Sequence, residues 1–159
     1  MEELDDEHHQ SVFKAYHVQD NTTRKLFALP LPNAQGRWNI SPDGSRLAML
    51  QPTLHNGTIQ IRLLNGALER EIKVKGWNDF EGVDWAADGK SLVLGVGTLN
   101  VTWLHNAGAL LRTDMQGNVQ LLWSRTGASD SLAIHSPDGK HLAMLDDVAN
   151  RNVWLFEGF

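Results

Sequence analysis

The chain has 159 residues, of which 42% are apolar, and its 14 basic and 19 acidic side chains give a net charge of −5. This length and apolar content fit one domain with a sizeable core, and the negative charge excludes the basic surface that nucleic-acid binding needs. The sequence has no apolar run of about 18 residues for a membrane span, and its first residues lack the basic and then apolar pattern that predicts a signal peptide. The absence of cysteine excludes disulfides, thiolate catalysis and cysteine-based zinc sites.

Residues 1–10 and 11–32 differ in composition. The first ten residues contain five carboxylates and two adjacent histidines, which is typical of a flexible acidic tail. Two neighbouring histidines on such a tail make a poor metal site, and none is expected there. Alternating apolar and polar residues then predict strands at 12–18 and 24–29, the second stopped by Pro30.

Residues 35–77 contain the first complete set of four short strands. Asp43-Gly44 separates the first two strands and Asn65-Gly66 the last two, and both dipeptides are strong hairpin signals. The expected strands are 37–41, 46–51, 58–64 and 69–75.

The following residues repeat this arrangement. Residues 80–124 carry turns at Asp88-Gly89 and Gln116-Gly117, and residues 130–159 begin again with a turn at Asp138-Gly139. The expected strands are 82–86, 91–96, 109–114, 119–124, 131–136, 141–146 and 152–157.

One repeated turn organises the whole sequence. Ser41-Pro42-Asp43-Gly44 recurs as Ser136-Pro137-Asp138-Gly139, and Ala86-Ala87-Asp88-Gly89 is a changed copy between them. The turn aspartates are 45 and then 50 residues apart, and such a period decides the fold. Proline fixes φ, aspartate caps the turn through its side chain and glycine accepts φ > 0. The predicted structural turn residues are Asp43, Gly44, Asp88, Gly89, Asp138 and Gly139.

The Ser-Pro-Asp-Gly turn, followed by Leu-Ala and by a later strand such as Asn152–Phe156, resembles the repeat of the TolB-like, WD-repeat-related β-propeller family. The resemblance covers nearly all of residues 11–159. It implies an all-β fold of tandem four-stranded antiparallel blades, with a partial blade at 11–32, blades at 35–77 and 80–124, and an incomplete blade at 130–159.

This makes about three and a quarter blades, whereas a propeller ring usually closes with four to eight. Two alternatives follow from the unpaired strand edges. Either the remainder of a larger parent chain completes the ring, or two copies form a homodimer. In such a dimer, Arg24–Leu29 of one copy would lie beside Asn152–Phe156 of the other.

The longest connection in the sequence supplies the candidate contact residues. The insertion before strand 109–114 contains Trp103, His105 and Asn106, and the equivalent loop of the preceding blade contains His55 and Asn56. The resemblance implies that these loops share the ligand face with the loops between blades. Loops on a rigid scaffold often carry function. The five residues are therefore candidates for ligand or partner contact; the alternative is that each loop only packs over its own blade.

Other polar and aromatic residues fit structural roles. Asn39 and Asp84 align and are expected on inner strands near a central channel, where polar groups often only bind water. His135 aligns with Trp85 and is expected to be a buried histidine with its polar atoms satisfied. Of the six tryptophans, all but Trp103 fall in or beside strands and are expected to fill the core.

No motif of a catalytic nucleophile, a bound cofactor or a catalytic metal occurs in the sequence. We therefore expect a non-catalytic module that binds a protein or peptide and uses no cofactor or metal. One alternative is the substrate-gating propeller of a prolyl-oligopeptidase-like peptidase, which needs an α/β-hydrolase domain in the same protein. Another is the sensor domain of a larger signalling protein. The resemblance to TolB implies a periplasmic location.

Overall fold

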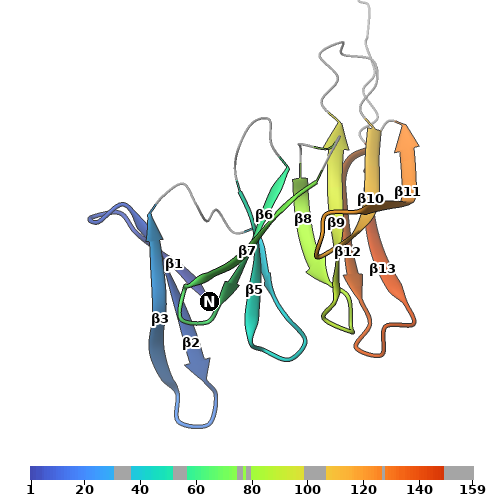
Figure 1. Ribbon diagram of the computed structural model, residues 1–159. Helices are drawn as coiled ribbons and strands as arrows, with labels where there is room; N and C mark the ends of the chain where they lie inside the picture. Colours follow the sequence, from blue (N-terminus) through green and yellow to red (C-terminus); the bar gives the residue numbers. More distant parts are fainter. Residues whose placement is uncertain are drawn as a thin grey trace, which may run out of the picture.

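The computed structural model describes residues 1–30, 37–51, 57–74, 77, 80–98, 107–126 and 128–148. In these residues it contains thirteen β-strands, arranged in four antiparallel sheets, and no helix. The first three sheets follow one another from left to right in Figure 1, and the last sheet overlaps the third in this view, where β12 contacts β8, β9 and β10. This is the all-β arrangement of tandem propeller blades that the repeat predicts.

Each sheet is a simple meander, because neighbouring strands in the sheet are also neighbours in the sequence. Every observed strand from β2 onward overlaps an expected one. The first two sheets contain β1 (Glu2–Asp5), β2 (Gln10–His17) and β3 (Thr22–Pro30), then β4 (Trp38–Ile40), β5 (Arg46–Leu50), β6 (Thr58–Leu63) and β7 (Leu68–Lys73). The last two contain β8 (Phe80–Trp85), β9 (Ser91–Thr98), β10 (Ala107–Asp114) and β11 (Val119–Thr126), then β12 (Ala128–His135) and β13 (Leu142–Val148). The predicted strand at 152–157 lies outside the described residues.

The prediction of a flexible tail at residues 1–10 is wrong. Strand β1 pairs with β2 in antiparallel register, so that Glu2 lies opposite Phe13. The Trp38 indole N–H donates a hydrogen bond of 2.7 Å to the Glu2 carboxylate, and the N-terminal ammonium donates one of 2.8 Å to the Lys14 carbonyl. Of the acidic side chains on this short strand, Glu3 is exposed, whereas Glu2 and Asp5 are partly buried and accept hydrogen bonds from Trp38 and Gln10, so their charge does not prevent pairing. The first sheet therefore has three strands.

The three repeated turns have the same backbone geometry. Gly44, Gly89 and Gly139 have φ of 70°, 63° and 69°. In each turn the glycine N–H donates to the carbonyl three residues earlier, at 2.8, 2.8 and 2.9 Å. The turn aspartate accepts from the backbone N–H two residues later, at 3.1, 2.9 and 3.1 Å. This geometry requires glycine at its positive-φ position, since other residues are strained there.

The core lies between the sheets. Strand β5 reads Leu47-Ala48-Met49-Leu50, a continuous apolar run, and all four side chains are buried. Continuous burial occurs because both faces of the sheet are covered, so the alternation of a half-exposed strand is absent. Leu47 and Met49 pack towards Phe13 in the first sheet, whereas Ala48 and Leu50 pack with residues of β8, β9 and β10.

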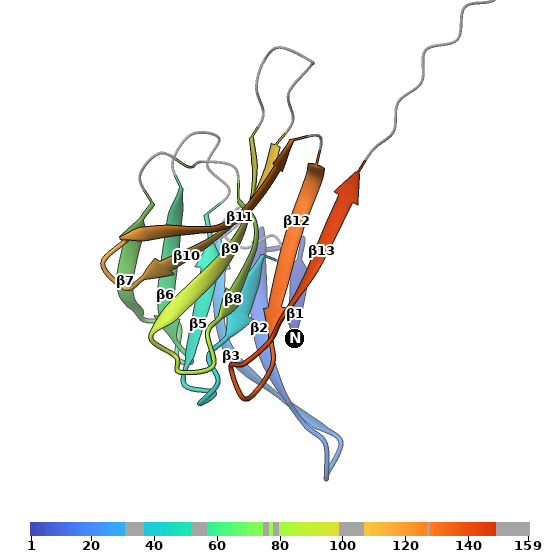
Figure 2. The same cartoon turned by 90° about the vertical axis from the view of Figure 1, so that its right-hand side faces the viewer.

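The last sheet is covered less completely. Ala133 of β12 packs against Val93 and Leu110 of the preceding sheet. Ile134 and Leu145 are nevertheless 65% and 58% exposed. Figure 2 views the chain from the side of this sheet, with β13 at its edge. The part of the chain that the structure describes has no helix that could cross a membrane.

Candidate functional site

The predicted contact residues Trp103, His105, Asn106, His55 and Asn56 all lie outside the described residues. The described ends of the flanking strands β5, β6, β9 and β10 lie at the end of the blades opposite the Asp-Gly turns (Figure 1). The site that the structure does describe lies at the other end, beside those turns.

Polar side chains link the inner strands of three successive sheets. The Asn39 side-chain amide donates to Asp84 Oδ1 at 2.8 Å, and the His135 backbone N–H donates to Asp84 Oδ2 at 2.8 Å. Asp84 Oδ1 also accepts from the Trp85 N–H at 2.9 Å. Asn39 and Asp84 therefore lie on inner strands, as the repeat alignment predicts, and their side chains form hydrogen bonds with other protein groups. This network holds β4, β8 and β12 side by side.

Two junctions between sheets bring adjacent Asp-Gly turns together. At the first of them, between sheets β4–β7 and β8–β11, arginine side chains form hydrogen bonds from one sheet to the other. Arg46 donates to the Gly89 carbonyl at 3.1 Å, and its guanidinium carbon lies 4.9 Å from the centre of the Trp85 ring. Arg70 donates to the Met115 carbonyl at 2.9 Å, and Arg37 donates to the Phe80 carbonyl. We call the Arg46–Trp85 pair the plug, because it fills the space between adjacent Asp-Gly turns.

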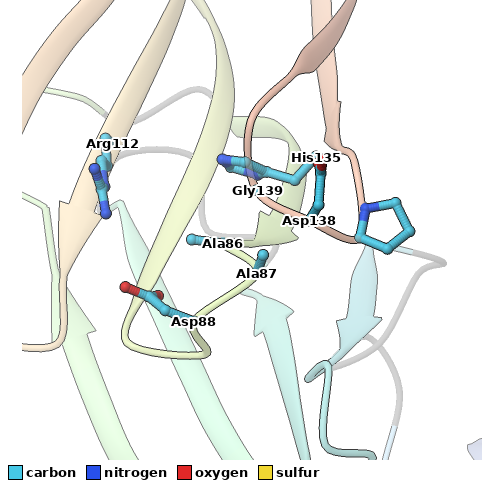
Figure 3. A pocket seen from close by; sticks show the side chains of 8 residues that line it. Ala86, Ala87, Asp88, Arg112, His135, Asp138 and Gly139 are labelled. Atoms are coloured by element: carbon cyan, nitrogen blue, oxygen red, sulfur yellow. The ribbon is translucent and has the colours of Figure 1, made fainter.

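The second junction, between sheets β8–β11 and β12–β13, has no plug. Ser91 takes the place of Arg46 in the repeat, and His135 takes the place of Trp85. A pocket of about 440 Å³ lies here between the two turns (Figure 3). Its lining residues are Ala86, Ala87, Asp88, Arg112, His135, Pro137, Asp138 and Gly139.

Two side chains bring unused hydrogen-bonding capacity to the pocket. Arg112 Nε donates to Ser91 Oγ at 3.0 Å, and the described residues provide no partner for its two terminal nitrogens. The His135 side chain is 16% exposed, and its buried Nδ1 has no hydrogen-bond partner in the described part of the chain. The nearest carboxylate oxygen, Asp84 Oδ2, is 3.8 Å away. The prediction of a fully satisfied His135 is therefore wrong, because Nδ1 is buried and no described group lies within hydrogen-bond distance of it.

The two carboxylates at the pocket are engaged by their own turns. Asp138 Oδ1 accepts from the Ser136 hydroxyl at 2.6 Å and from the Lys140 N–H at 3.1 Å. The hydrogen bond from Ser136 is the main cause that lowers the pKa of Asp138 below 3.8. Asp88 accepts from the Lys90 N–H in the same way. Their negative charges are thus held at the rim, while Arg112 provides the positive charge.

Sequence reasoning missed Arg112, because a single arginine in a strand belongs to no motif. A signal was present in the repeat. Aligning the turns places Ser91 opposite Arg46 and His135 opposite Trp85, so that a large pair is replaced by a smaller one at one junction. Only the folded structure shows that Arg112 comes from β10 to this position.

Comparison with known proteins identifies the fold. No protein-family model and no curated protein matches the chain. Among solved structures, TolB from Acinetobacter baumannii superposes with a TM-score of 0.59 at 15% identity, over 91% of this chain and 36% of TolB. Hydrazine synthase of Kuenenia stuttgartiensis gives 0.59 at 18% identity, over 91% of this chain and 40% of that one.

The acylaminoacyl peptidase of Pyrococcus horikoshii gives a TM-score of 0.53 at 15% identity, over 91% of this chain and 24% of the peptidase. These similarities define the chain as a β-propeller structure. It is a TolB-like β-propeller in its blade architecture, and it spans about a third of the length of TolB.

Proposed function

We propose that the chain is a non-catalytic, TolB-like propeller module that binds a protein or peptide at the junction between sheets β8–β11 and β12–β13. One observation carries the proposal: a pocket of about 440 Å³ is lined by His135 and by Arg112, whose two terminal guanidinium nitrogens have no partner among the described residues. This volume lies within the range of about 300–1,000 Å³ that is usual for ligand pockets.

The walls of the pocket suit recognition. Ala86, Ala87 and Gly139 belong to hydrogen-bonded turns, and Arg112 lies on a central strand of a four-stranded sheet. A rigid frame loses little conformational entropy of its own when a ligand binds to it. The chemistry presented to a ligand is hydrogen bonding and charge, and the proposal assigns Arg112 and His135 to ligand contact.

A peptide array tests this proposal. Labelled chain would be incubated with immobilised random peptides, in the wild-type form and as the variants Arg112→Gln and Lys73→Gln. Lys73 is an exposed basic residue on β7, in a different sheet, and serves as the control. A common set of peptides should bind the wild type and Lys73→Gln, and binding to Arg112→Gln should fall by about tenfold or more.

Two results would overturn the proposal. Binding that is equal for all three proteins, or absent from all peptides, would remove the pocket as a peptide site. Cleavage of bound peptides by the purified chain, abolished by a point mutation, would show that the module is catalytic.

The gating propeller of a peptidase remains the alternative function. It is distinguished by a hydrolase domain in the same protein, and by peptide-size selectivity that changes when this chain is deleted. A sensor role is distinguished by a kinase or DNA-binding domain in the parent protein. The periplasmic location implied by the likeness to TolB is part of the proposal, and cell fractionation would test it.

The homodimer also stays a proposal. Strand β3 pairs only with β2 among the described residues, so one of its edges is available to another strand. The partner segment Asn152–Phe156 lies outside the described residues. Light scattering over a range of concentrations should show a dimer if two copies complete one ring, and a monomer at high micromolar concentration would exclude it.

A further inference from the structure

We infer that the pocket between sheets β8–β11 and β12–β13 binds a carboxylate group, held by the Arg112 guanidinium with His135 beside it. The inference rests on the proposed function and gives the bound peptide its chemistry. The carboxylate would be either the C-terminus of the peptide or an aspartate or glutamate side chain.

A comparison of the two junctions between adjacent Asp-Gly turns explains why a ligand fits only the second. At the first junction, the Arg46 guanidinium lies over Trp85 and donates to Gly89, so the side chains of the protein fill the space between the turns. At the second junction, the equivalent positions hold Ser91 and His135, which are smaller. The turns still approach each other closely, since a Cβ added to Gly139 would lie 3.0 Å from Ala87 Cβ. The second junction therefore has the same turn backbone as the first but lacks the side chains of the plug, and a pocket results.

Arg112 is positioned to bind a planar anion. Its Nε is held by Ser91 Oγ at 3.0 Å, which limits rotation of the guanidinium. The two terminal nitrogens then present parallel N–H groups, and this fork matches the two oxygens of a carboxylate. Figure 3 shows the Arg112 and His135 side chains around the same space, with Ala86 and Ala87.

His135 gives the second contact. Nδ1 is buried beside Asp84, so Nε2 is the ring nitrogen that can meet a ligand in the pocket. In the tautomer that carries its proton on Nε2, the imidazole donates to a carboxylate oxygen. The backbone of His135 is held in place, because its N–H donates a hydrogen bond to the Asp84 carboxylate.

The remaining charges near the pocket define which anion fits. Asp88 and Asp138 line it, and Asp84 lies behind His135. One guanidinium facing these carboxylates favours a singly charged group over a phosphate dianion, since each further negative charge on the ligand meets like charges. A peptide with a neutral or basic residue beside its carboxylate suits the pocket best.

Nuclear magnetic resonance titration with short peptides tests the inference on the intact chain. The first pair is N-acetyl trialanine with a free C-terminus and the same peptide amidated. The second pair is an amidated, acetylated tripeptide with glutamate in the middle and its glutamine counterpart. Inorganic phosphate is the fifth probe. The signals to follow are the Arg112 side chain and the backbone amides of Ala87 and Gly139.

The charged member of at least one pair should shift these signals with an affinity at least about tenfold higher than its uncharged counterpart, and than phosphate. The pair that responds identifies the source of the carboxylate. Arg112→Gln should abolish the preference, and Lys73→Gln should keep it. If Arg112→Gln does not fold, Arg112→Lys replaces it. Lysine keeps the charge but lacks the fork, so the preference should weaken.

The outcomes separate this inference from the proposed function. Equal shifts from charged and uncharged peptides, or no shift from any of them, overturn the carboxylate site. If array peptides nevertheless bind in an Arg112-dependent way, the proposed function stands without it. If carboxylate peptides shift the pocket signals while the array shows no Arg112-dependent binding, the carboxylate site stands and the proposed recognition of longer peptides at this junction fails.

Discussion

The turn glycines share a backbone conformation but differ in their surroundings. A Cβ added to Gly44 would meet no atom within 4 Å, whereas one added to Gly139 would lie 3.0 Å from Ala87 Cβ. Both have φ near 70°, where an L side chain is strained. The pair therefore separates backbone strain from crowding.

We predict that Gly44→Ala lowers the free energy of unfolding by about 1–2 kcal/mol, and that Gly139→Ala lowers it further, because the neighbouring turn must also move. Urea unfolding followed by tryptophan fluorescence measures both. Equal losses for the two variants would show that Ala87 moves aside for the new methyl group with no further loss of stability.

The turn aspartates make stability depend on pH. The Ser41 hydroxyl, with the Ser45 N–H and hydroxyl, lowers the pKa of Asp43 from 3.8 to about 2. A carboxyl whose pKa is lower in the folded state stabilises the fold above its unfolded pKa. That contribution is lost as the pH falls from about 3.8 towards 2.

We predict that the melting temperature of the wild type falls over this pH range and that Asp43→Asn falls less steeply. Ser41→Ala should move the pKa of Asp43 back towards 3.8, because it removes the largest cause of the shift. Carbon-detected titration of the Asp43 carboxyl checks the second point. An unchanged pKa in Ser41→Ala would contradict the assignment.

At the scale of strands, Asp84 is the residue that joins neighbouring blades. It accepts hydrogen bonds from Asn39, Trp85 and His135, which lie on three different inner strands. Its side chain is only 13% exposed, so water would seldom replace the lost acceptor for these donors if the carboxylate were removed.

We predict that Asp84→Asn lowers the free energy of unfolding by about 1–3 kcal/mol, because one of its two acceptor oxygens becomes an NH₂ group that faces a donor. The matched control is Asp88→Asn, an exposed turn position where asparagine can also cap the turn. Its effect should stay below about 0.5 kcal/mol. Similar effects for both variants would mean that the inner-strand network adds little.

Much of this arrangement could be predicted from the sequence, because turns and strands depend on nearby residues. Asp138-Gly139 has its own turn chemistry, and β9 has its own apolar run. Strand β1 could not be predicted, since Glu2 is held by Trp38, far along the chain. The pocket was missed for the same reason: Arg112 and His135 meet only when two sheets pack together, and neither residue carries a local pattern that shows it.

Across the whole molecule, burial decreases from the centre to the last sheet. Leu92, Leu94 and Val96 of β9 are fully buried, whereas Ile134 of β12 is 65% exposed and Leu145 of β13 is 58% exposed. Local opening free energies follow buried apolar contact, so this gradient has a measurable consequence.

We predict that amides of β12 and β13 exchange with solvent through openings of lower free energy than those of β9 and β10. Hydrogen exchange followed by mass spectrometry measures the protection of each strand. Equal protection would show that another surface, from a second copy or a parent chain, covers the exposed face of the last sheet.

The Arg46–Trp85 plug has a consequence for protein engineering. Both junctions share their turn backbone, so the space between the turns depends on the side chains at equivalent positions rather than on loop shape. A combinatorial library at positions 46, 85, 91 and 135 would vary the cavity at each junction while keeping every turn residue. The blade repeat would then serve as a scaffold in which binding pockets are opened or filled one junction at a time.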